Sequence, residues 1–241
     1  MNPAKQLVIA NRILAREEVV DAYGHVSVRH PEHPERFLLA ISKAPELIEA
    51  PDILEFDLEA RPLKKDPRPL YVERFIHAAI YEARPDVMAV VHAHAEDVLA
   101  FGITKAPLRP VIHSGAFIGA QVPVWDIADK FGDRTNLLVT NMDQARDLAR
   151  ALAKNNVALM RGHGFAAGAR SLIDVVRMSV YLPRNARVQQ RAMQMGEYKP
   201  LSAGEIESRL SGYQPQSPET QRAWRYWATR AGCASLLDDP A

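Results

Sequence analysis

Two spacings of apolar residues alternate along the chain and predict both helices and strands. Apolar positions near the 3.6-residue period predict helices at residues 4–20, 73–83, 96–101, 144–154 and 171–195. Short apolar or alternating runs predict strands at residues 26–28, 37–41, 51–60, 87–91, 108–112, 121–124, 157–160 and 165–169. Because the two kinds of element alternate, the pattern predicts an α/β layered fold.

Nothing in the pattern divides the chain into separate units. No repeat, linker or shift in composition interrupts the 241 residues, and a single hydrophobic core stops growing only at roughly 250–300 residues. We therefore predict one domain over residues 1–241. Helical segments at 205–210 and 219–230 form a C-terminal tail from about residue 201.

Composition narrows the class of protein. Hydrophobic residues are 47% and charged residues 24%, as in folded globular proteins. Lys and Arg total 30 against 29 Asp and Glu, so the basic excess typical of nucleic-acid binders is absent. No apolar stretch approaches the roughly 18 residues of a membrane span. With one cysteine, Cys233, and no signal-peptide pattern, we expect a cytoplasmic protein without an intramolecular disulfide.

Three histidines stand where a metal site is plausible. His92 and His94 end an apolar strand, and side chains at i and i+2 share a face, so both can reach one ion. The alternative is a pair of surface histidines. His163 lies between two glycines after another apolar strand and is either a third ligand or a turn residue without a role. Three imidazoles would leave coordination positions open, as in catalytic sites.

Two further features carry polar chemistry. Glu73 begins the helix before the His92 strand and is either a partner of the helix dipole or a general acid/base. A further alternative is that Glu73 is a metal ligand while the site is empty. Strand alternation places His25, Ser27 and Arg29 on one face, which is either solvated or holds an anionic substrate.

The order of these features resembles the class II aldolase/adducin family over roughly residues 5–190. The matching segments are Gly24-His25-Val26-Ser27-Val28-Arg29, Glu73-Arg74-Phe75-Ile76-His77, Arg84-Pro85-Asp86, His92-Ala93-His94 and Gly162-His163-Gly164. The resemblance implies a three-layer α/β/α sandwich around a mainly antiparallel sheet. It also implies a homotetramer with sites near subunit interfaces. A divalent metal would be held by His92, His94 and His163, with Glu73 as the acid/base.

Two departures from the family pattern bear on the substrate. Tyr71-Val72 stands where sugar-phosphate members carry Ser-Ser, and Ser42-Lys43-Ala44-Pro45 replaces a glycine-containing turn. A phosphate cradle needs closely approaching backbone N–H groups, which glycine usually permits. The sequence therefore disfavours a phosphorylated sugar.

A third departure, His25 in place of the family Asn, points to decarboxylation. Histidine can exchange a proton near neutral pH. Gly-His-x-Ser-x-Arg resembles the branch that decarboxylates hydroxy-aromatic or pyridine dicarboxylates and carboxymuconic semialdehydes. There CO2 leaves instead of an aldehyde, and a metal stabilises the resulting enolate. We expect Arg29, Ser27 and Lys43 to bind a carboxylic acid substrate, and His25 or Glu73 to deliver the proton.

Several alternatives stay open at this point. The chain could be a class II aldolase acting on a hydroxy-oxo acid or a sugar phosphate, or a non-catalytic adducin-like binding module. The latter relatives tend to lose the metal histidines. Zn, Mn, Co and Fe all suit three imidazoles. His113 could line the pocket or be structural. Tail aromatics could close a neighbouring subunit's site, but packing is the preferred interpretation for Tyr213, Trp224, Tyr226 and Trp227.

Overall fold

A single mixed sheet organises the molecule. The computed structural model describes residues 2–214 and 217–237. Within them, seven strands are arranged in the order β3-β2-β1-β4-β7-β6-β5. The strands are β1 (His25–Arg29), β2 (Arg36–Ala40), β3 (Ile53–Asp57), β4 (Ala89–Ala93), β5 (Val124–Trp125), β6 (Val157–Met160) and β7 (Gly164–Ala169). All neighbours pair antiparallel except β5 and β6, so the predicted mainly antiparallel sheet is confirmed.

The sheet is accompanied by helices along the described chain. They are α1 (Pro3–Arg16), α2 (Arg74–Ala83), α3 (Glu96–Ile103), α4 (Ala128–Phe131), α5 (Met142–Leu152), α6 (Leu172–Met195), α7 (Ala203–Ser211), α8 (Pro218–Arg230) and α9 (Ala234–Leu237). Short 3₁₀ turns η1 (Pro45–Leu47), η2 (Ala50–Asp52) and η3 (His113–Ile118) lie in the connections. In the described part of the chain, no helix has the length and apolar character needed to cross a membrane.

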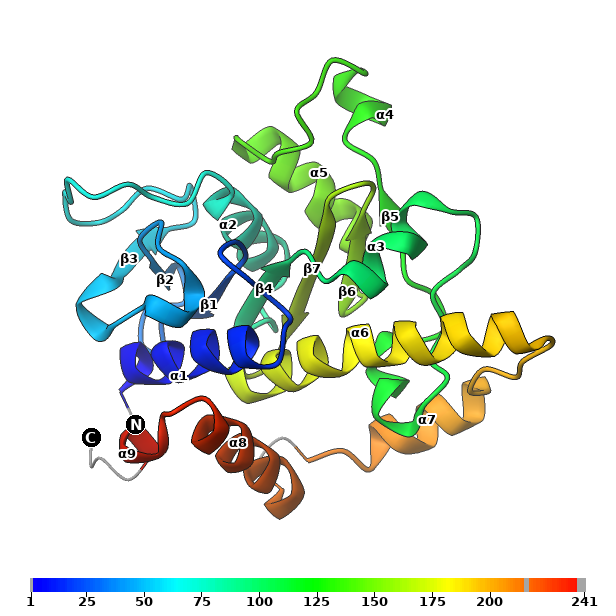
Figure 1. Cartoon of the computed structure of the whole chain (residues 1–241). Helices are drawn as coiled ribbons and strands as arrows, with labels where there is room; N and C mark the ends of the chain where they lie inside the picture. Colours follow the sequence, from blue (N-terminus) through cyan, green and yellow to red (C-terminus); the bar gives the residue numbers. More distant parts are fainter. Residues whose placement is uncertain (1, 215–216, 238–241) are drawn as a thin grey trace.

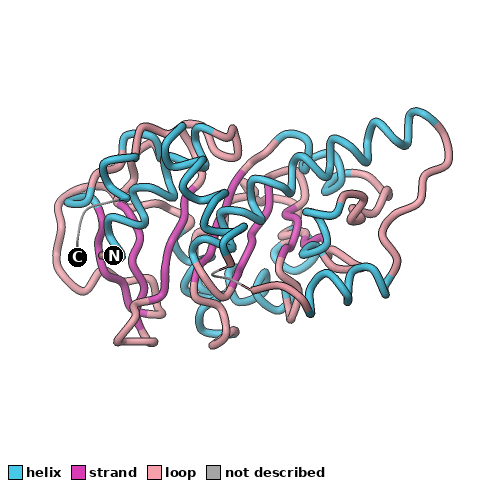
Figure 2. Tube along the Cα trace, turned by 90° about the horizontal axis from the view of Figure 1, so that it is seen from below, coloured by secondary structure: helices cyan, strands magenta, loops and turns pink. Residues whose placement is uncertain are grey.

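Helices cover both faces of the sheet, which confirms the three-layer α/β/α sandwich. One core cluster packs α2 and α5 against the face that carries Val90, and the other packs α1, α3, α6 and α8 against the face that carries Val91. These neighbouring residues of β4 belong to opposite cores because strand side chains alternate. Figure 1 shows α2 and α5 on one side of the sheet and α1, α6 and α8 on the other. The strands lie in a row across Figure 2.

Several predicted elements have other bounds in the structure. The strand predicted at 51–60 is shortened to Ile53–Asp57, and the one predicted at 121–124 overlaps β5 only at Val124. The first helix ends at Arg16 instead of residue 20, because Glu18 adopts a left-handed φ of 58° and the chain turns away. Residues 108–112 form no strand. Two prolines, Pro107 and Pro110, remove N–H donors there, and side chains of α6 take over as bonding partners. Asn185 accepts from the Val111 N–H at 2.8 Å, and Gln189 accepts from the Arg109 N–H at 2.9 Å.

Candidate metal centre

The register of three strands brings distant histidines together. β1 pairs with β4 so that His25 lies directly opposite His92, and residues opposite each other in a sheet project to the same face. His92 and His94 are two residues apart and share that face. Gly164 opens β7, the other neighbour of β4, and places His163 beside them. The face is the one covered by α2, so Glu73 at the start of that helix completes the group.

Four side chains form a compact cluster of possible metal ligands. One ligand atom from each of Glu73, His92, His94 and His163 lies within 4.8 Å of the other three. Glu73 Oε2 is 3.3 Å from the Nε2 atoms of both His92 and His163, and the Nε2 atoms of His92 and His94 are 3.0 Å apart. The three predicted metal-ligand histidines and the predicted acid/base therefore meet at one point.

Backbone carbonyls fix the protonation of two of these rings. His92 Nδ1 lies 3.0 Å from the Phe165 carbonyl oxygen and His163 Nδ1 lies 2.8 Å from the Leu137 carbonyl oxygen. A carbonyl oxygen only accepts, so each Nδ1 carries the proton and donates it. In the neutral ring, Nε2 then keeps its lone pair, which faces the cluster. Metal-binding histidines are typically oriented in this way, so the donor set fits a divalent cation.

Glu73 is held in its ionised form. Its Oε1 accepts from the Val139 N–H at 2.9 Å, which directs Oε2 towards the histidines. Burial would raise the pKa of Glu73, but His92 and His163 outweigh burial and hold the pKa well below its usual range. For His163, burial lowers the pKa, but the hydrogen bond and charge of Glu73 raise it above 6.5. This buried carboxylate therefore favours a positive charge at the cluster.

The close approach of β7 to β4 depends on a glycine. A Cβ on Gly164 would lie 2.3 Å from the Ala93 carbonyl oxygen and 3.0 Å from His94 Cδ2. Both distances are below normal van der Waals contact, so only glycine allows the strand to pass this close to His94. The Gly-His-Gly motif thus contributes the ligand His163 and, through Gly164, leaves the space that the ligand His94 occupies.

A buried chain of polar groups leads away from the cluster through His25. His25 Nδ1 is 2.6 Å from His77 Nε2, and Ser27 Oγ is 2.6 Å from His77 Nδ1 and 2.8 Å from the Tyr81 hydroxyl. All four side chains are buried. Burial, followed by the nearby histidines, lowers the pKa of His25 and lowers that of His77 to about 3, so these rings are neutral. The hydroxyl of Ser27 is directed into this chain.

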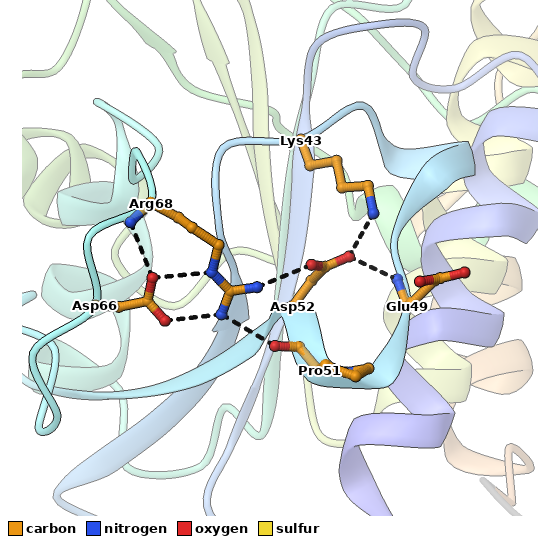
Figure 3. Close-up of polar contacts among 6 residues, drawn as sticks. All are labelled: Lys43, Glu49, Pro51, Asp52, Asp66 and Arg68. Carbon is orange, nitrogen blue, oxygen red and sulfur yellow. Dashed lines mark hydrogen bonds and ion pairs between the residues drawn. The ribbon is translucent and has the colours of Figure 1, made fainter.

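Two predicted substrate-binding residues lie elsewhere and are internally bonded. The Arg29 guanidinium donates to the carbonyl oxygens of Val87, Pro34, Tyr81 and Arg84, which anchors β1 to the end of α2. Lys43 Nζ lies 2.7 Å from Asp52 Oδ2, and Figure 3 shows it pointing at that carboxylate, which Arg68 also contacts. The structure thus brings neither Arg29 nor Lys43 into the cluster.

Space for a small molecule adjoins the cluster. A cavity of about 790 Å³ reaches His94 and is bordered by the α1–β1 connection, the start of α3 and the middle of α6. His94 is half-buried, while His92 is fully buried. A substrate can therefore approach the cluster from the His94 side. His113 is exposed and lines a different cavity, between α6 and α8.

Two parts of the site, His77 and the loop at residues 137–139, were not predicted from the sequence. The sequence pattern gives His77 no role of its own, yet it is fully buried against His25. Its spacing from Glu73, one helical turn, was the available signal, since i and i+4 share a face. The other part is the loop at residues 137–139, whose backbone holds both His163 and Glu73. Leu137 adopts a left-handed φ of 65° there, which no pattern of side chains indicated.

Comparison with known proteins agrees with this geometry. Residues 5–190 match the class II aldolase and adducin N-terminal domain. The chain is 38% identical over 203 residues to the decarboxylase tropJ of Talaromyces stipitatus, covering 79% of this chain and 76% of that protein. It is 27% identical over 250 residues to 3,4-dihydroxyphthalate decarboxylase of Arthrobacter keyseri, covering 95% and 93%.

A solved structure shows the same fold. An aldolase II superfamily protein from Pseudomonas syringae superposes with a TM-score of 0.80 at 21% identity, covering 97% of this chain and 93% of that one. The matched domain includes every residue of the Glu73 and histidine cluster. By its sequence match, its fold and its cluster of ligands, the chain belongs to the class II aldolase and adducin family.

Proposed function

We propose that the chain is a metal-dependent carbon–carbon lyase that decarboxylates a non-phosphorylated hydroxy-aromatic dicarboxylate or a ring-cleavage acid. The observation that carries this proposal is the convergence of three histidines and one glutamate on a single point. The choice of decarboxylation is supported by relatives whose names state that reaction, tropJ and 3,4-dihydroxyphthalate decarboxylase.

His92, His94 and His163 would hold the metal. Zn or Mn is our first choice, and Co or Fe suits the same donors. When bound, the ion would act as a Lewis acid that stabilises negative charge developing on the substrate. The oriented Nε2 atoms of His92 and His163 support this assignment, because their Nδ1 protons are already committed to backbone carbonyls.

Proton delivery falls to His25 or Glu73. His25 Nδ1 is occupied by His77, so His25 Nε2 is the atom left for a substrate, and the ring lies 5.2 Å from that of His92. Glu73 Oε1 is occupied by the Val139 N–H, which leaves Oε2. Either atom would first accept the proton of the substrate hydroxyl and then return it to the carbon that loses CO2.

The surroundings of the cluster support a substrate without phosphate. Lys43, in the turn that replaces the family's glycine-containing turn, is bonded to Asp52, and Arg29 is bonded to backbone carbonyls. Val72, at a place where sugar-phosphate relatives carry a hydroxyl, is exposed and apolar.

We also propose a homotetramer, for which light scattering should give four times the 26.9 kDa chain mass.

The test is CO2 release from metal-loaded protein. The panel contains ortho-hydroxy aromatic dicarboxylates, pyridine dicarboxylates and carboxylated muconic semialdehydes. We expect release from at least one of them by the wild type, and its loss in a His92→Ala variant. If the wild type binds its metal fully and releases no CO2 from any of them, the decarboxylase proposal is wrong. An aldolase acting on an oxo acid then becomes the leading function.

A further inference from the structure

A second cavity lies between α6 and α8, outside the histidine cluster. Its volume is about 440 Å³, within the range of roughly 300–1,000 Å³ typical of small-molecule sites. No residue of the Glu73 and histidine cluster lines it. Figure 1 shows α8 below α1 and the beginning of α6, and α7 below the later part of α6. The cavity is therefore formed largely by the C-terminal segment that the proposed reaction does not use.

Arginine dominates the wall of this cavity. Glu219 is the single acidic residue among the described residues that line it. Five arginines face it from three helices, namely Arg177 and Arg184 of α6, Arg209 of α7, and Arg222 and Arg230 of α8. The chain as a whole is close to neutral, with a net charge of +1. The positive charge is thus a local property of this cavity.

Four of the five guanidinium groups stack on tyrosine rings. The distances from the guanidinium carbon to the ring centre are 4.6 Å for Arg177 and 5.7 Å for Arg209 on Tyr213, 5.2 Å for Arg184 on Tyr181, and 5.5 Å for Arg230 on Tyr226. Stacking occupies the flat face of a guanidinium and leaves its N–H edge free for hydrogen bonds. The rings of the tyrosines therefore fix the orientation of these arginines.

Ion pairs leave part of this charge unbalanced. Arg184 and Arg230 share the carboxylate of Glu17 at 2.6 and 2.8 Å, and Arg209 is 3.8 Å from Glu219. In the described part of the chain, Arg177 Nε is buried without a hydrogen-bond partner. A buried donor without an acceptor is costly, and native structures rarely leave one unsatisfied. An anion in the cavity would supply that acceptor.

We propose that this cavity is a second binding site, for a small organic anion with at least two carboxylate or phosphate groups. Arginine edges match both groups in two-point hydrogen bonds. Two charged groups are needed because the arginines without a strong carboxylate partner stand on different helices, Arg177 on α6, Arg209 on α7 and Arg222 on α8. The site does not depend on the proposed decarboxylation.

Calorimetric titration of the purified, assembled protein tests this site. Phthalate is the dicarboxylate probe and fructose 1,6-bisphosphate is the bisphosphate probe. The titrations therefore distinguish a site for carboxylates from a site for phosphates. We expect at least one to bind the wild type with a submillimolar Kd at a site that persists in His92→Ala. The double variant Arg177→Gln/Arg222→Gln should weaken that binding about tenfold or more, as expected from lost charge-assisted hydrogen bonds.

The matched control is Arg225→Gln, an exposed arginine of α8 that does not line the cavity, and it should leave binding unchanged. Arg222→Glu alone changes an exposed side chain and provides a second test if the double variant does not fold. Three outcomes would overturn the site. They are no binding of either anion to the wild type, equal binding by wild type and cavity variants, or an equal loss in Arg225→Gln.

Discussion

At the scale of single residues, the cluster is positioned by backbone groups as much as by side chains. The Phe165 and Leu137 carbonyls orient His92 and His163, and the Val139 N–H orients Glu73. Gly164 allows β7 to pass beside His94. A side-chain substitution cannot remove a backbone carbonyl or N–H group. The role of the backbone is therefore tested by a substitution that shifts it without changing the charge of the cluster.

Gly164→Ala should weaken metal binding without removing any ligand. Its new Cβ would meet the Ala93 carbonyl oxygen at 2.3 Å, so the backbone near His94 must shift. We expect metal affinity to fall about 10–100-fold, the usual effect of disturbing groups that orient ligands. Competition with a chelator measures the affinity. Gly102→Ala is the matched control, since its nearest neighbour is 3.6 Å away. Equal affinity in wild type and Gly164→Ala would contradict this view.

His25→Asn tests the proposed proton donor. Asn can still accept or donate a hydrogen bond to His77, but it cannot transfer a proton near neutral pH. Turnover of a substrate from the CO2-release panel should fall about 100-fold or more, while the metal content per chain stays full. His33→Asn, a half-exposed histidine in the β1–β2 turn, is the control and should keep wild-type turnover. Unchanged turnover in His25→Asn would assign proton delivery to Glu73 instead.

Asp52 should make stability depend on pH in the acid range. Burial raises its pKa, but hydrogen bonds from Lys43 and the Glu49 N–H, with the charge of Arg68, outweigh burial and lower it (Figure 3). A depressed folded pKa adds stability above the unfolded value of about 3.9, and this is lost as pH falls through the folded pKa.

Asp52→Asn should therefore cost about 1–2 kcal/mol of unfolding free energy at pH 7. The difference from wild type should shrink below pH of about 4. Urea unfolding at a series of pH values measures it. Asp143→Asn, an exposed carboxyl on α5, should show neither effect. A difference that stays constant down to the acid limit would refute the assignment.

Part of the site could be predicted from residues alone. The spacing of His92 and His94, the Gly-His163-Gly motif and the place of Glu73 predicted side chains that do converge. Arg29, Ser27 and Lys43 were expected at the substrate because of their strand face and charge. Their actual partners are carbonyls, a buried histidine and Asp52, which come from other elements. Sequence spacing gives the face of a residue but not the groups packed against it.

At the scale of elements, side chains of α6 replace a strand partner for residues 107–112. Asn185 Nδ2 donates to the Arg109 carbonyl at 2.7 Å, and its Oδ1 accepts from the Val111 and Ile112 N–H groups. The sequence predicts a strand at residues 108–112, but its pattern cannot show that a helix side chain supplies the hydrogen bonds. Elements with strong periodicity, such as α2 and α5, lie where the sequence placed them to within two residues.

Asn185→Ala should therefore destabilise the fold. The change leaves one carbonyl and two N–H groups, all part-buried, without their partner, at a cost of about 2–3 kcal/mol in unfolding free energy. Gln194→Ala, an exposed position on the same helix, should stay within about 0.5 kcal/mol of wild type. Urea unfolding of both variants gives the comparison. Equal stability of the two variants would mean that water or a local rearrangement satisfies residues 109–112.

At the scale of the whole molecule, the sandwich places its two candidate sites in different layers. The histidine cluster lies on the α2 face of the sheet, and the arginine cavity lies between α6 and α8 on the opposite side. The C-terminal part of α6 extends past the sheet and exposes Val188, Met193 and Met195 (Figures 1 and 2). These side chains are candidates for a contact in the proposed homotetramer.

The measurement that tests the account most directly is CO2 release as metal is returned to stripped protein. Chelator-treated chains receive increasing Zn or Mn, and the rate is plotted against bound metal per chain. Our account predicts no release without metal, a linear rise, and a plateau at one ion per chain that is absent in His163→Ala. Full CO2 release by metal-free protein, or by His163→Ala, would contradict a decarboxylase that works through the Glu73 and histidine cluster.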